Sequence, residues 1–433
     1  MTPNDEGPTR FRWLPPGLRP KVQMNLRQER VFLLVGLAAL FAGYDVSIYG
    51  LSIPRIQASL HIPEDQIGLT ISYFRLATLV AMPIVAMADL FGRRRVLLVT
   101  LFGQGLFTLL TAFAGDYTQF VWLQILTRVF GYCEEMLMYV VIAEEVAAAA
   151  RGWSNGTLSA MYYVGIGIAS LCYAAVTILP GDWRAMYVIG AAPILLVAFL
   201  RRRLPETRRF EKRDKEIHKL SSRIGAAVEL LRLLVRDYPK RLAGIVVTAT
   251  AFGFATAPAF NLSAKYIQST LGYRPYQTTI LLISGGLAGV ALSVLTGRLS
   301  DRAGRRRTLF FTATLTLIAY ATFYSGARGA AAVAIWIVAN YAYIASDAMI
   351  AGYATEIVPT AYRATVGGLR YLFYIGAGAV SLALEGVAYN HFHAHGPAML
   401  VMLAAVPIAL IAICTLPEPA GRTLEDISEH PHP

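Results

Sequence analysis

Long apolar segments recur along the whole chain and are separated by short polar stretches. Each is close to the ~20 residues that a helix needs to cross a bilayer. Residues 1–30 are polar and basic and have no apolar core before a small-residue cleavage site, so no cleaved signal peptide is expected. The pattern predicts twelve membrane-spanning helices, at about 31–53, 66–88, 95–114, 118–141, 152–178, 182–200, 241–267, 276–298, 307–327, 330–353, 364–389 and 396–415.

Composition agrees with a membrane protein. Of the 433 residues, 56% are hydrophobic and 15% are charged, and this apolar share lies above the ~45–50% of soluble domains. A disordered chain is excluded and a water-soluble enzyme is a poor fit. Cys133, Cys172 and Cys414 all lie in apolar segments, where a thiol usually packs as a small hydrophobe, so neither a disulfide nor a metal site is expected.

The positive charge indicates the orientation. The net charge is +12, and 31 of the 39 Lys and Arg residues fall on one side of the membrane if the N-terminus is cytoplasmic. The positive-inside rule therefore predicts cytoplasmic termini, in a bacterial inner membrane. Because the charge is spread over many loops and forms no single patch, nucleic acid is not an expected partner.

The basic stretch between the sixth and seventh spans divides the chain and begins with Arg201, which is counted among the cytoplasmic charges. Its apolar residues between 217 and 234 recur at intervals of three and four, which predicts an amphipathic helix on the inner membrane surface. The expected organisation is a tail at 1–30, a six-helix bundle at 31–203, a linker at 204–240, a second six-helix bundle at 241–415 and a tail at 416–433.

The two predicted bundles share a sequence pattern at a constant offset of 212 residues. Matching motifs in one register indicate two six-helix halves related by an axis along the membrane normal. The matching features are Asp89, Gly92 and Arg94 with Asp301, Gly304 and Arg306, then Glu144 and Arg151 with Glu356 and Arg363, and Leu204-Pro-Glu with Leu416-Pro-Glu.

These motifs resemble the major facilitator superfamily, whose hallmark is Gly-x-x-x-Asp-Arg-x-Gly-x-Arg-Arg after the second helix and again after the eighth. The second copy is complete, and the first has Val85 and Leu90 in place of Gly and Arg. The resemblance implies an all-α membrane fold of two pseudo-symmetric six-helix halves that work by alternating access. It also implies a cytoplasmic gate formed by Asp89, Gly92, Arg94, Glu144, Arg151, Gly297, Asp301, Arg302, Gly304, Arg306, Glu356 and Arg363.

Within that superfamily the chain resembles the branch of sugar porters, organic-ion transporters and metabolite:proton symporters. The C-terminal Pro417-Glu418 stretch is similar to the sugar porters, whereas Tyr44-Asp45 with Tyr49, and Glu134, are similar to the metabolite symporters.

Acidic residues inside the spans are candidates for proton coupling, because an ionisable group in hydrocarbon costs about 2.5–3.5 kcal/mol and marks a functional site unless a partner explains it. Asp45 is expected to bind and release a proton, the alternative being a helix-to-helix hydrogen bond. Glu134 and Glu135 point about 100° apart. The resemblance favours Glu134 as the acid that faces the cavity. Glu135 is favoured instead by its position on the same helix face as Arg128. A permanent structural ion pair is the alternative for either acid.

Three arginines within the spans predict an anionic substrate, since a guanidinium does not lose its charge and needs an acid or an anion beside it. Arg75 either pairs with Asp45 or another acid or contacts substrate. The full set of expected substrate contacts is Tyr44, Tyr49, Arg75, Arg128, Asn261, Asn340, Asp347, Arg370 and Tyr374, with helix packing as the alternative for the asparagines. Glu385 is expected to be solvated near the outer end.

The predicted function is a proton-coupled secondary transporter of a small organic anion, such as a carboxylate or aromatic acid, and not an enzyme. No nucleotide-binding motif is present, so the proton gradient is the expected energy source and no cofactor is needed. The alternating His391, His393 and His395 do not by themselves predict a metal. A monomer in the lipid bilayer is expected, and the alternatives are a sugar or polyol symporter, a multidrug exporter, or a transporter-like sensor that no longer cycles.

Overall fold

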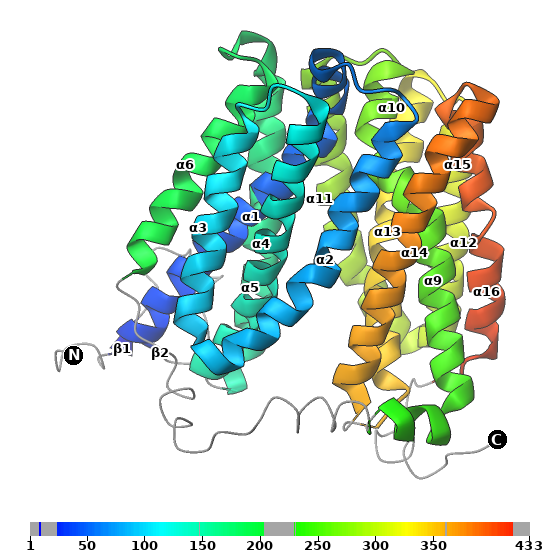
Figure 1. Cartoon of the computed structure of the whole chain (residues 1–433). Helices are drawn as coiled ribbons and strands as arrows, with labels where there is room; N and C mark the ends of the chain where they lie inside the picture. Colours follow the sequence, from blue (N-terminus) through cyan, green and yellow to red (C-terminus); the bar gives the residue numbers. More distant parts are fainter. Residues whose placement is uncertain are drawn as a thin grey trace. The chain divides into compact units, whose positions relative to one another are not determined.

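The structure is a computed structural model that describes residues 8–9, 24–146, 148–202, 229, 231–359 and 362–418. The described residues are almost entirely helical (Figure 1), apart from the two-residue antiparallel strands β1 (Pro8–Thr9) and β2 (Met24–Asn25). The chain forms two compact units. Unit 1 comprises Met1–His61 and Ala77–Ile217, and unit 2 comprises Ile62–Leu76 and His218–Pro433.

All twelve predicted spans coincide with helices, so this prediction is confirmed. The seventh span is divided between α9 and α10, and the twelfth between α15 and α16. The helices of the N-terminal half are α1 (Leu26–Leu60), α2 (Gln66–Phe91), α3 (Arg93–Thr111), α4 (Tyr117–Glu145), α5 (Ala148–Ala174), the short 3-10 helix η3 (Val176–Ile178) and α6 (Trp183–Arg201). Those of the C-terminal half are α9 (Pro239–Asn261), α10 (Ser263–Ser269), α11 (Pro275–Ala303), α12 (Arg305–Tyr324), α13 (Gly329–Glu356), α14 (Arg363–Phe392), α15 (His395–Leu403) and α16 (Val406–Thr415).

The first helix begins earlier than the pattern of apolar residues predicts. Asn25 accepts a hydrogen bond from the Gln28 backbone N–H at 2.9 Å, and the Gln28 side chain accepts one from the Asn25 N–H at 3.1 Å. This reciprocal capping satisfies two donors that a helix start leaves free. The helix therefore starts at Leu26, inside the stretch expected to be a tail.

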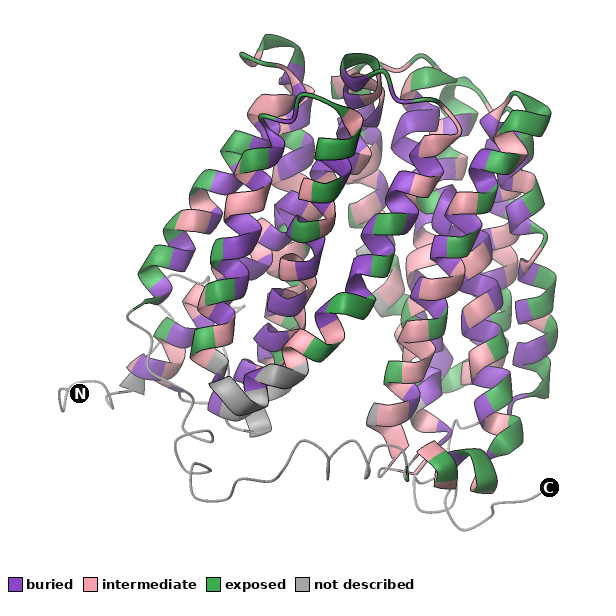
Figure 2. Ribbon diagram, viewed as in Figure 1, coloured by how far each residue is buried: buried purple, intermediate pink, exposed green. Residues whose placement is uncertain are grey.

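The helices carry apolar side chains on their outer faces as well as in their cores. Large exposed side chains such as Val99, Trp122, Leu287 and Ile411 lie on these helices. Exposed and buried positions alternate along the helices (Figure 2). Nine helical stretches among the described residues are long and apolar enough to cross a membrane. A helix with an apolar face on both sides is typical of a lipid-exposed bundle.

Equivalent helices pack together in the two units. In unit 1 the contact of α1 with α5 is close, because a Cβ on Gly165 would lie 1.7 Å from the Leu40 carbonyl oxygen and one on Gly43 would lie 2.0 Å from that of Tyr162. In unit 2, α9 packs on α14 with Gly253 against the Tyr374 backbone. Small residues allow such approach of helix backbones in membranes.

The two copies of the loop motif have the same backbone conformation. Gly92 has φ 93° and ψ 141°, and Gly304 has φ 100° and ψ 142°. Side-chain-bearing residues rarely adopt this region, so glycine is required where α2 turns into α3 and where α11 turns into α12. The repeat found in the sequence is thus present in the backbone.

Helix α2 is divided between the two compact units. Its first turns and the preceding turn, Ile62–Leu76, pack with unit 2, and the remainder, from Ala77, packs with unit 1. Much of the predicted linker, including most of its amphipathic helix, lies outside the described residues. Its last part is described, and Leu234 and Tyr238 are buried in the core of unit 2. The predicted domain boundaries stay predictions.

Candidate functional site

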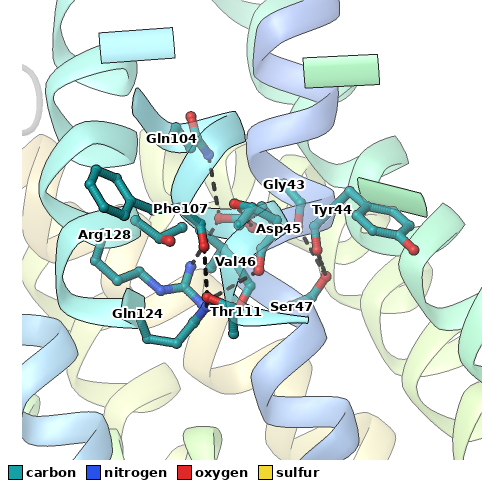
Figure 3. A network of polar contacts seen from close by, with 12 residues as sticks. Gly43, Tyr44, Asp45, Val46, Ser47, Gln104, Phe107, Thr111, Gln124 and Arg128 are labelled. Carbon is teal, nitrogen blue, oxygen red and sulfur yellow. Dashed lines mark hydrogen bonds and ion pairs between the residues drawn. The ribbon is translucent and has the colours of Figure 1, made fainter. Parts of the chain in front are cut away.

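Asp45 and Arg128 form a buried polar centre in unit 1 (Figure 3). Asp45 lies in the middle of α1 and is 1% exposed, and Arg128 lies on α4 and is 5% exposed. Their charged groups are 3.9 Å apart from Nη1 to Oδ2, which is long for an ion pair. The Arg128 Nη2 donates to the carbonyl oxygens of Asp45 at 3.4 Å and of Val46 at 3.3 Å.

Two polar side chains of α3 complete the surroundings of the Asp45 carboxylate. The Thr108 hydroxyl donates to Oδ1 at 2.9 Å, and the Gln104 amide nitrogen is 3.4 Å from Oδ2. A hydroxyl can donate to a carboxylate or accept from a carboxylic acid, so it serves both protonation states. Since the guanidinium binds backbone carbonyls as well, Asp45 can gain a proton without leaving Arg128 wholly unsatisfied.

The neighbouring acids Glu134 and Glu135 have different surroundings. Glu134 is fully buried, forms an ion pair with Arg201 of α6 and accepts from the Thr100 hydroxyl at 3.2 Å. The Arg201 Nη2 also donates to the Leu34 carbonyl oxygen at 3.1 Å. Glu135 has no ion pair or hydrogen bond to any residue in the described part of the chain. Glu134 therefore has the contacts of a structural pair, whereas Glu135 has no such partner among the described residues.

This contrast predicts that the same substitution lowers stability at Glu134 but not at Glu135. Glu134→Gln leaves the buried Arg201 without its counter-charge and should lower the free energy of unfolding by about 1–2 kcal/mol. The loss is this small because the unfolded state in a membrane also finds polar partners for Arg201. For a unit of this size, each kcal/mol lost lowers the melting temperature Tm by about 2–4 °C. Glu135→Gln should leave Tm unchanged.

Thermal unfolding of both variants in the same detergent measures the difference. If Glu135→Gln lowered Tm as much as Glu134→Gln does, the assignment of Glu134 as the structural acid would be wrong.

A second polar group lies in unit 2, where two arginines approach one tyrosine. The guanidinium carbon of Arg75 is 5.7 Å from the centre of the Tyr374 ring, and that of Arg370 is 5.9 Å from it. The Tyr374 hydroxyl forms a 2.8 Å hydrogen bond with that of Tyr343. Asp347 lies 3.4 Å from Arg370 Nη1, and its side chain is 40% exposed.

The charges in this group do not balance. Arg75 and Arg370 contribute two positive charges and Asp347 one negative charge, which leaves one positive charge in excess. Arg75 is 9% exposed, its Nε has no hydrogen-bond partner, and no carboxylate in the described part of the chain is within ion-pairing distance of it. Its guanidinium lies against Gly378, where a Cβ would come within 3.0 Å. The expected alternative of a structural pair for Arg75 is therefore not found among the described residues.

The remaining expected contact residues mostly have packing roles. The Tyr44 hydroxyl donates to the Met186 carbonyl oxygen at 3.1 Å, and Tyr49 packs on Phe120 with ring centres 5.8 Å apart. Asn261 donates to Ala257 of its own helix at 2.7 Å. Asn340 differs, because it is 4% exposed and its Oδ1 has no hydrogen-bond partner in the described residues.

Glu385 was expected to be solvated, and this is wrong. The side chain is 1% exposed and lies 2.7 Å from the ring Nδ1 of His395. The short turn between α14 and α15 places His395 back over the end of α14. The position of Glu385 near the outer end of its span does not reveal this contact.

Arg305, within the second copy of the gate motif, makes several polar contacts in unit 2. Its guanidinium lies 3.0 Å from Glu356, and its backbone N–H, with that of Arg306, donates to the Glu418 carboxylate at 2.7 and 3.0 Å. Glu418 therefore binds the start of α12, where the helix dipole favours an anion. The sequence did not assign this role to Glu418, although it marked the Leu-Pro-Glu repeat.

Other gate residues have fewer described contacts. Arg363 has no hydrogen-bond partner at Nε or Nη2 among the described residues, so it does not pair with Glu356. Arg94 donates to the Arg202 carbonyl oxygen at 2.5 Å, Arg302 is exposed, and a Cβ on Gly297 would meet no atom within 4 Å. The side chains of Asp89, Glu144, Arg151 and Asp301 lie outside the described residues, and so does the Leu204-Pro-Glu copy.

Sequence reasoning missed the partners of the charged residues. Thr108 was not singled out, Gln104 and Tyr343 were noted only as polar residues of the spans, and Arg201 was counted as a cytoplasmic loop charge although it is 1% exposed. Gln104 and Thr108 are four residues apart on α3 and therefore lie on the same face of an otherwise apolar helix. This spacing was the signal in the sequence that could have identified them.

Twelve helices built from a six-helix repeat, with ionisable groups inside the spans, are typical of membrane transporters of small solutes. The profile of the Major Facilitator Superfamily matches residues 35–382 and, in a second match, 260–431. The chain therefore belongs to this family. It is an integral, polytopic membrane protein and a transporter, not an enzyme.

Similar proteins agree with this family. The probable 4-methylmuconolactone transporter of Cupriavidus pinatubonensis is 23% identical over 89% of this chain and 90% of its own. The cis,cis-muconate transport protein of Acinetobacter baylyi is 25% identical over 80% of this chain and 84% of its own. A crystal structure of a D-xylose-proton symporter matches the fold with a TM-score of 0.71 at 18% identity, covering 91% of this chain and 99% of that one.

Proposed function

We propose that the protein is a proton-coupled transporter that carries a small organic anion by alternating access, in a bacterial inner membrane and with both termini in the cytoplasm. The observation that carries the proposal is the excess positive charge at Arg75, Arg370 and Asp347 in unit 2. The clustering of Lys and Arg in the predicted inner loops supports the orientation.

An anion is the ligand that completes this group of charges. A buried guanidinium is costly inside a membrane and cannot become neutral, so a bound counter-charge is strongly favoured. A carboxylate matches the fork of an arginine with two parallel hydrogen bonds. The hydroxyls of Tyr343 and Tyr374, which are bonded to each other, offer a further donor to the same ligand.

The names of the relatives support the same substrate class. Cis,cis-muconate and 4-methylmuconolactone are the compounds named for the two relatives. A sugar or polyol, the substrate class of the structural match, brings no charge to compensate Arg75. An organic cation would add to the excess positive charge, which argues against multidrug export.

Proton coupling is proposed for Asp45 with Arg128, assisted by Glu135. The Asp45 carboxylate is buried, and its ion pair with Arg128 is long. Proton binding to Asp45 changes which charges are paired in unit 1, and a state-dependent change of this kind biases an equilibrium between conformations.

A thermal-shift screen of the purified protein tests the substrate class. Carboxylates including cis,cis-muconate, aromatic acids, sugars and organic cations are compared at pH 5.5 and 7.5. A ligand at 100 times its Kd stabilises the folded state by about 2.7 kcal/mol. We expect stabilisation by acids only, and stronger at pH 5.5, where the proton sites are filled. Stabilisation by sugars with none by acids would contradict the proposal.

A further inference from the structure

Four ionisable side chains meet inside unit 2 at the end of the helices predicted to face away from the cytoplasm. Glu64 comes from the turn between α1 and α2, Lys265 from α10, Glu385 from α14 and His395 from the start of α15. Lys265 and Glu385 are each 1% exposed, His395 is 7% exposed, and the Glu64 side chain is 28% exposed. Proposals about Asp45 and the arginines do not involve this group, which is called here the outer cluster.

His395 lies between the two acids. Its ring Nδ1 is 2.7 Å from Glu385 Oε1, and its Nε2 is 2.9 Å from Glu64 Oε1. Lys265 also forms an ion pair with the same Glu64 oxygen. Both nitrogens of one imidazole are thus within hydrogen-bond distance of carboxylate oxygens.

The surrounding elements add no further buried acid or cation to the contacts of the ring. Tyr389 of α14 stacks near it with ring centres 4.6 Å apart, and the Tyr324 carbonyl of α12 lies against Gly396, next to the histidine. Tyr266 of α10 packs on Tyr324. Asp65, beside Glu64, is bonded to Asn390 at 3.0 Å. Among the described residues, the charges at the ring are therefore those of the outer cluster.

Hydrogen-bond counting fixes the number of protons. An ionised carboxylate only accepts, and a neutral imidazole has one N–H and one acceptor nitrogen. With two ionised acids, a neutral ring would place a lone pair against a carboxylate oxygen on one side. An imidazolium donates on both sides. It also balances the charge, because two positive groups, Lys265 and His395, then face two negative groups, Glu64 and Glu385.

We propose that the outer cluster is a proton-binding site, in which His395 holds a proton as an imidazolium between Glu385 and Glu64. Glu385 strengthens the requirement for this proton. Its second oxygen, Oε2, is buried without a hydrogen-bond partner among the described residues, so the contact with His395 is the main compensation of its charge.

The position of Glu64 makes proton binding conditional on the packing of one segment. Glu64 belongs to Ile62–Leu76, the part of the N-terminal half that packs with unit 2. This segment is held closely, because a Cβ on Gly386 would lie 2.1 Å from the Asp65 carbonyl oxygen, and one on Gly68 would lie 2.1 Å from that of Leu382. If the segment leaves, His395 loses one acceptor and Lys265 its ion pair with Glu64. Departure of the segment therefore favours release of the proton, and a bound proton favours the packed state.

Nitrogen NMR of the full-length protein with 15N-labelled histidine, in detergent or lipid, tests the proposal without any substrate. The sequence has seven histidines. We expect one of them, His395, to keep both ring nitrogens protonated at pH 7.5. This signal should be absent in His395→Gln and present in His391→Gln, the matched control at an exposed position in the last turn of α14. A neutral ring for His395 at pH 7.5 would overturn the proposal.

A second variant keeps the test independent of whether His395→Gln folds. Glu64→Gln removes one negative charge next to the His395 ring, so the doubly protonated signal should be lost at a lower pH than in the unmodified protein. An unchanged titration in Glu64→Gln would also overturn the proposal. Asp65→Asn, which keeps the polar side chain next to Asn390, is the control and should titrate as the unmodified protein does.

Discussion

Replacing Asp45 by asparagine should abolish uphill accumulation of substrate while exchange of substrate across the membrane continues. Asparagine keeps the size of the side chain and can still accept from Thr108, but it cannot bind a proton. With one proton per substrate, a gradient of one pH unit supplies ~1.4 kcal/mol, or about tenfold accumulation. In the variant this ratio should fall to one. Exchange of labelled for unlabelled substrate needs no net proton movement and should remain.

The measurement uses proteoliposomes with an imposed pH gradient and the acid that gives the largest thermal shift. Asp116→Asn is the matched control. Asp116 is exposed and accepts from the Gln119 N–H at the start of α4, a position where asparagine caps a helix equally well. Accumulation should be unchanged in this control. Accumulation by Asp45→Asn equal to that of the unmodified protein would eliminate Asp45 as the coupling acid.

The fold could be predicted from the sequence because its determinants are local. The length of each apolar segment fixes a span, and the glycines of the two loop motifs fix the turns at Gly92 and Gly304. The earlier start of α1 at Leu26 was also readable in principle, since the capping residues Asn25 and Gln28 are only three apart. Their polarity made them resemble a tail instead.

The site could be predicted only as a set of residues, not as a set of pairs. Asp45 and Arg128 are 83 positions apart in the sequence, and Glu134 and Arg201 are 67 positions apart. Such pairs depend on which faces of distant helices meet, which no local pattern encodes. For the same reason Arg201 was read as a loop charge and Glu385 as a solvated acid. Conversely, the pairing of Glu134 became visible only when Arg201 was located beside it.

The charge of each polar group decides what it can do. The pair of Asp45 and Arg128 is neutral overall, so adding a proton creates a net positive charge there. The group of Arg75, Arg370 and Asp347 is already positive, so an added anion neutralises it. The proton is thus the ligand that changes the net charge of the Asp45–Arg128 pair, and the anion is the ligand that neutralises the group in unit 2. Each can shift a conformational equilibrium only by its difference in affinity between the two states.

Substitutions of opposite charge in unit 2 should change anion affinity in opposite directions. Arg75→Gln removes the unpaired guanidinium, and loss of a hydrogen bond to a charged group costs about 1.5–3 kcal/mol, or about 10- to 150-fold in Kd. Asp347→Asn removes the acid that lies 3.4 Å from Arg370, so the anion no longer competes with it. We expect binding to become roughly tenfold tighter.

Isothermal titration of the stabilising acid into each purified variant measures these changes. Arg328→Gln makes the same chemical change as Arg75→Gln at an exposed position of unit 2 and should leave Kd unchanged. The sign separates the substrate classes, because an organic cation would respond in the reverse direction and a neutral sugar would not respond to charge at all. Weaker binding of an acid to both Arg75→Gln and Asp347→Asn would mean that these residues shape the site sterically, and the proposed role of the excess positive charge would then be wrong.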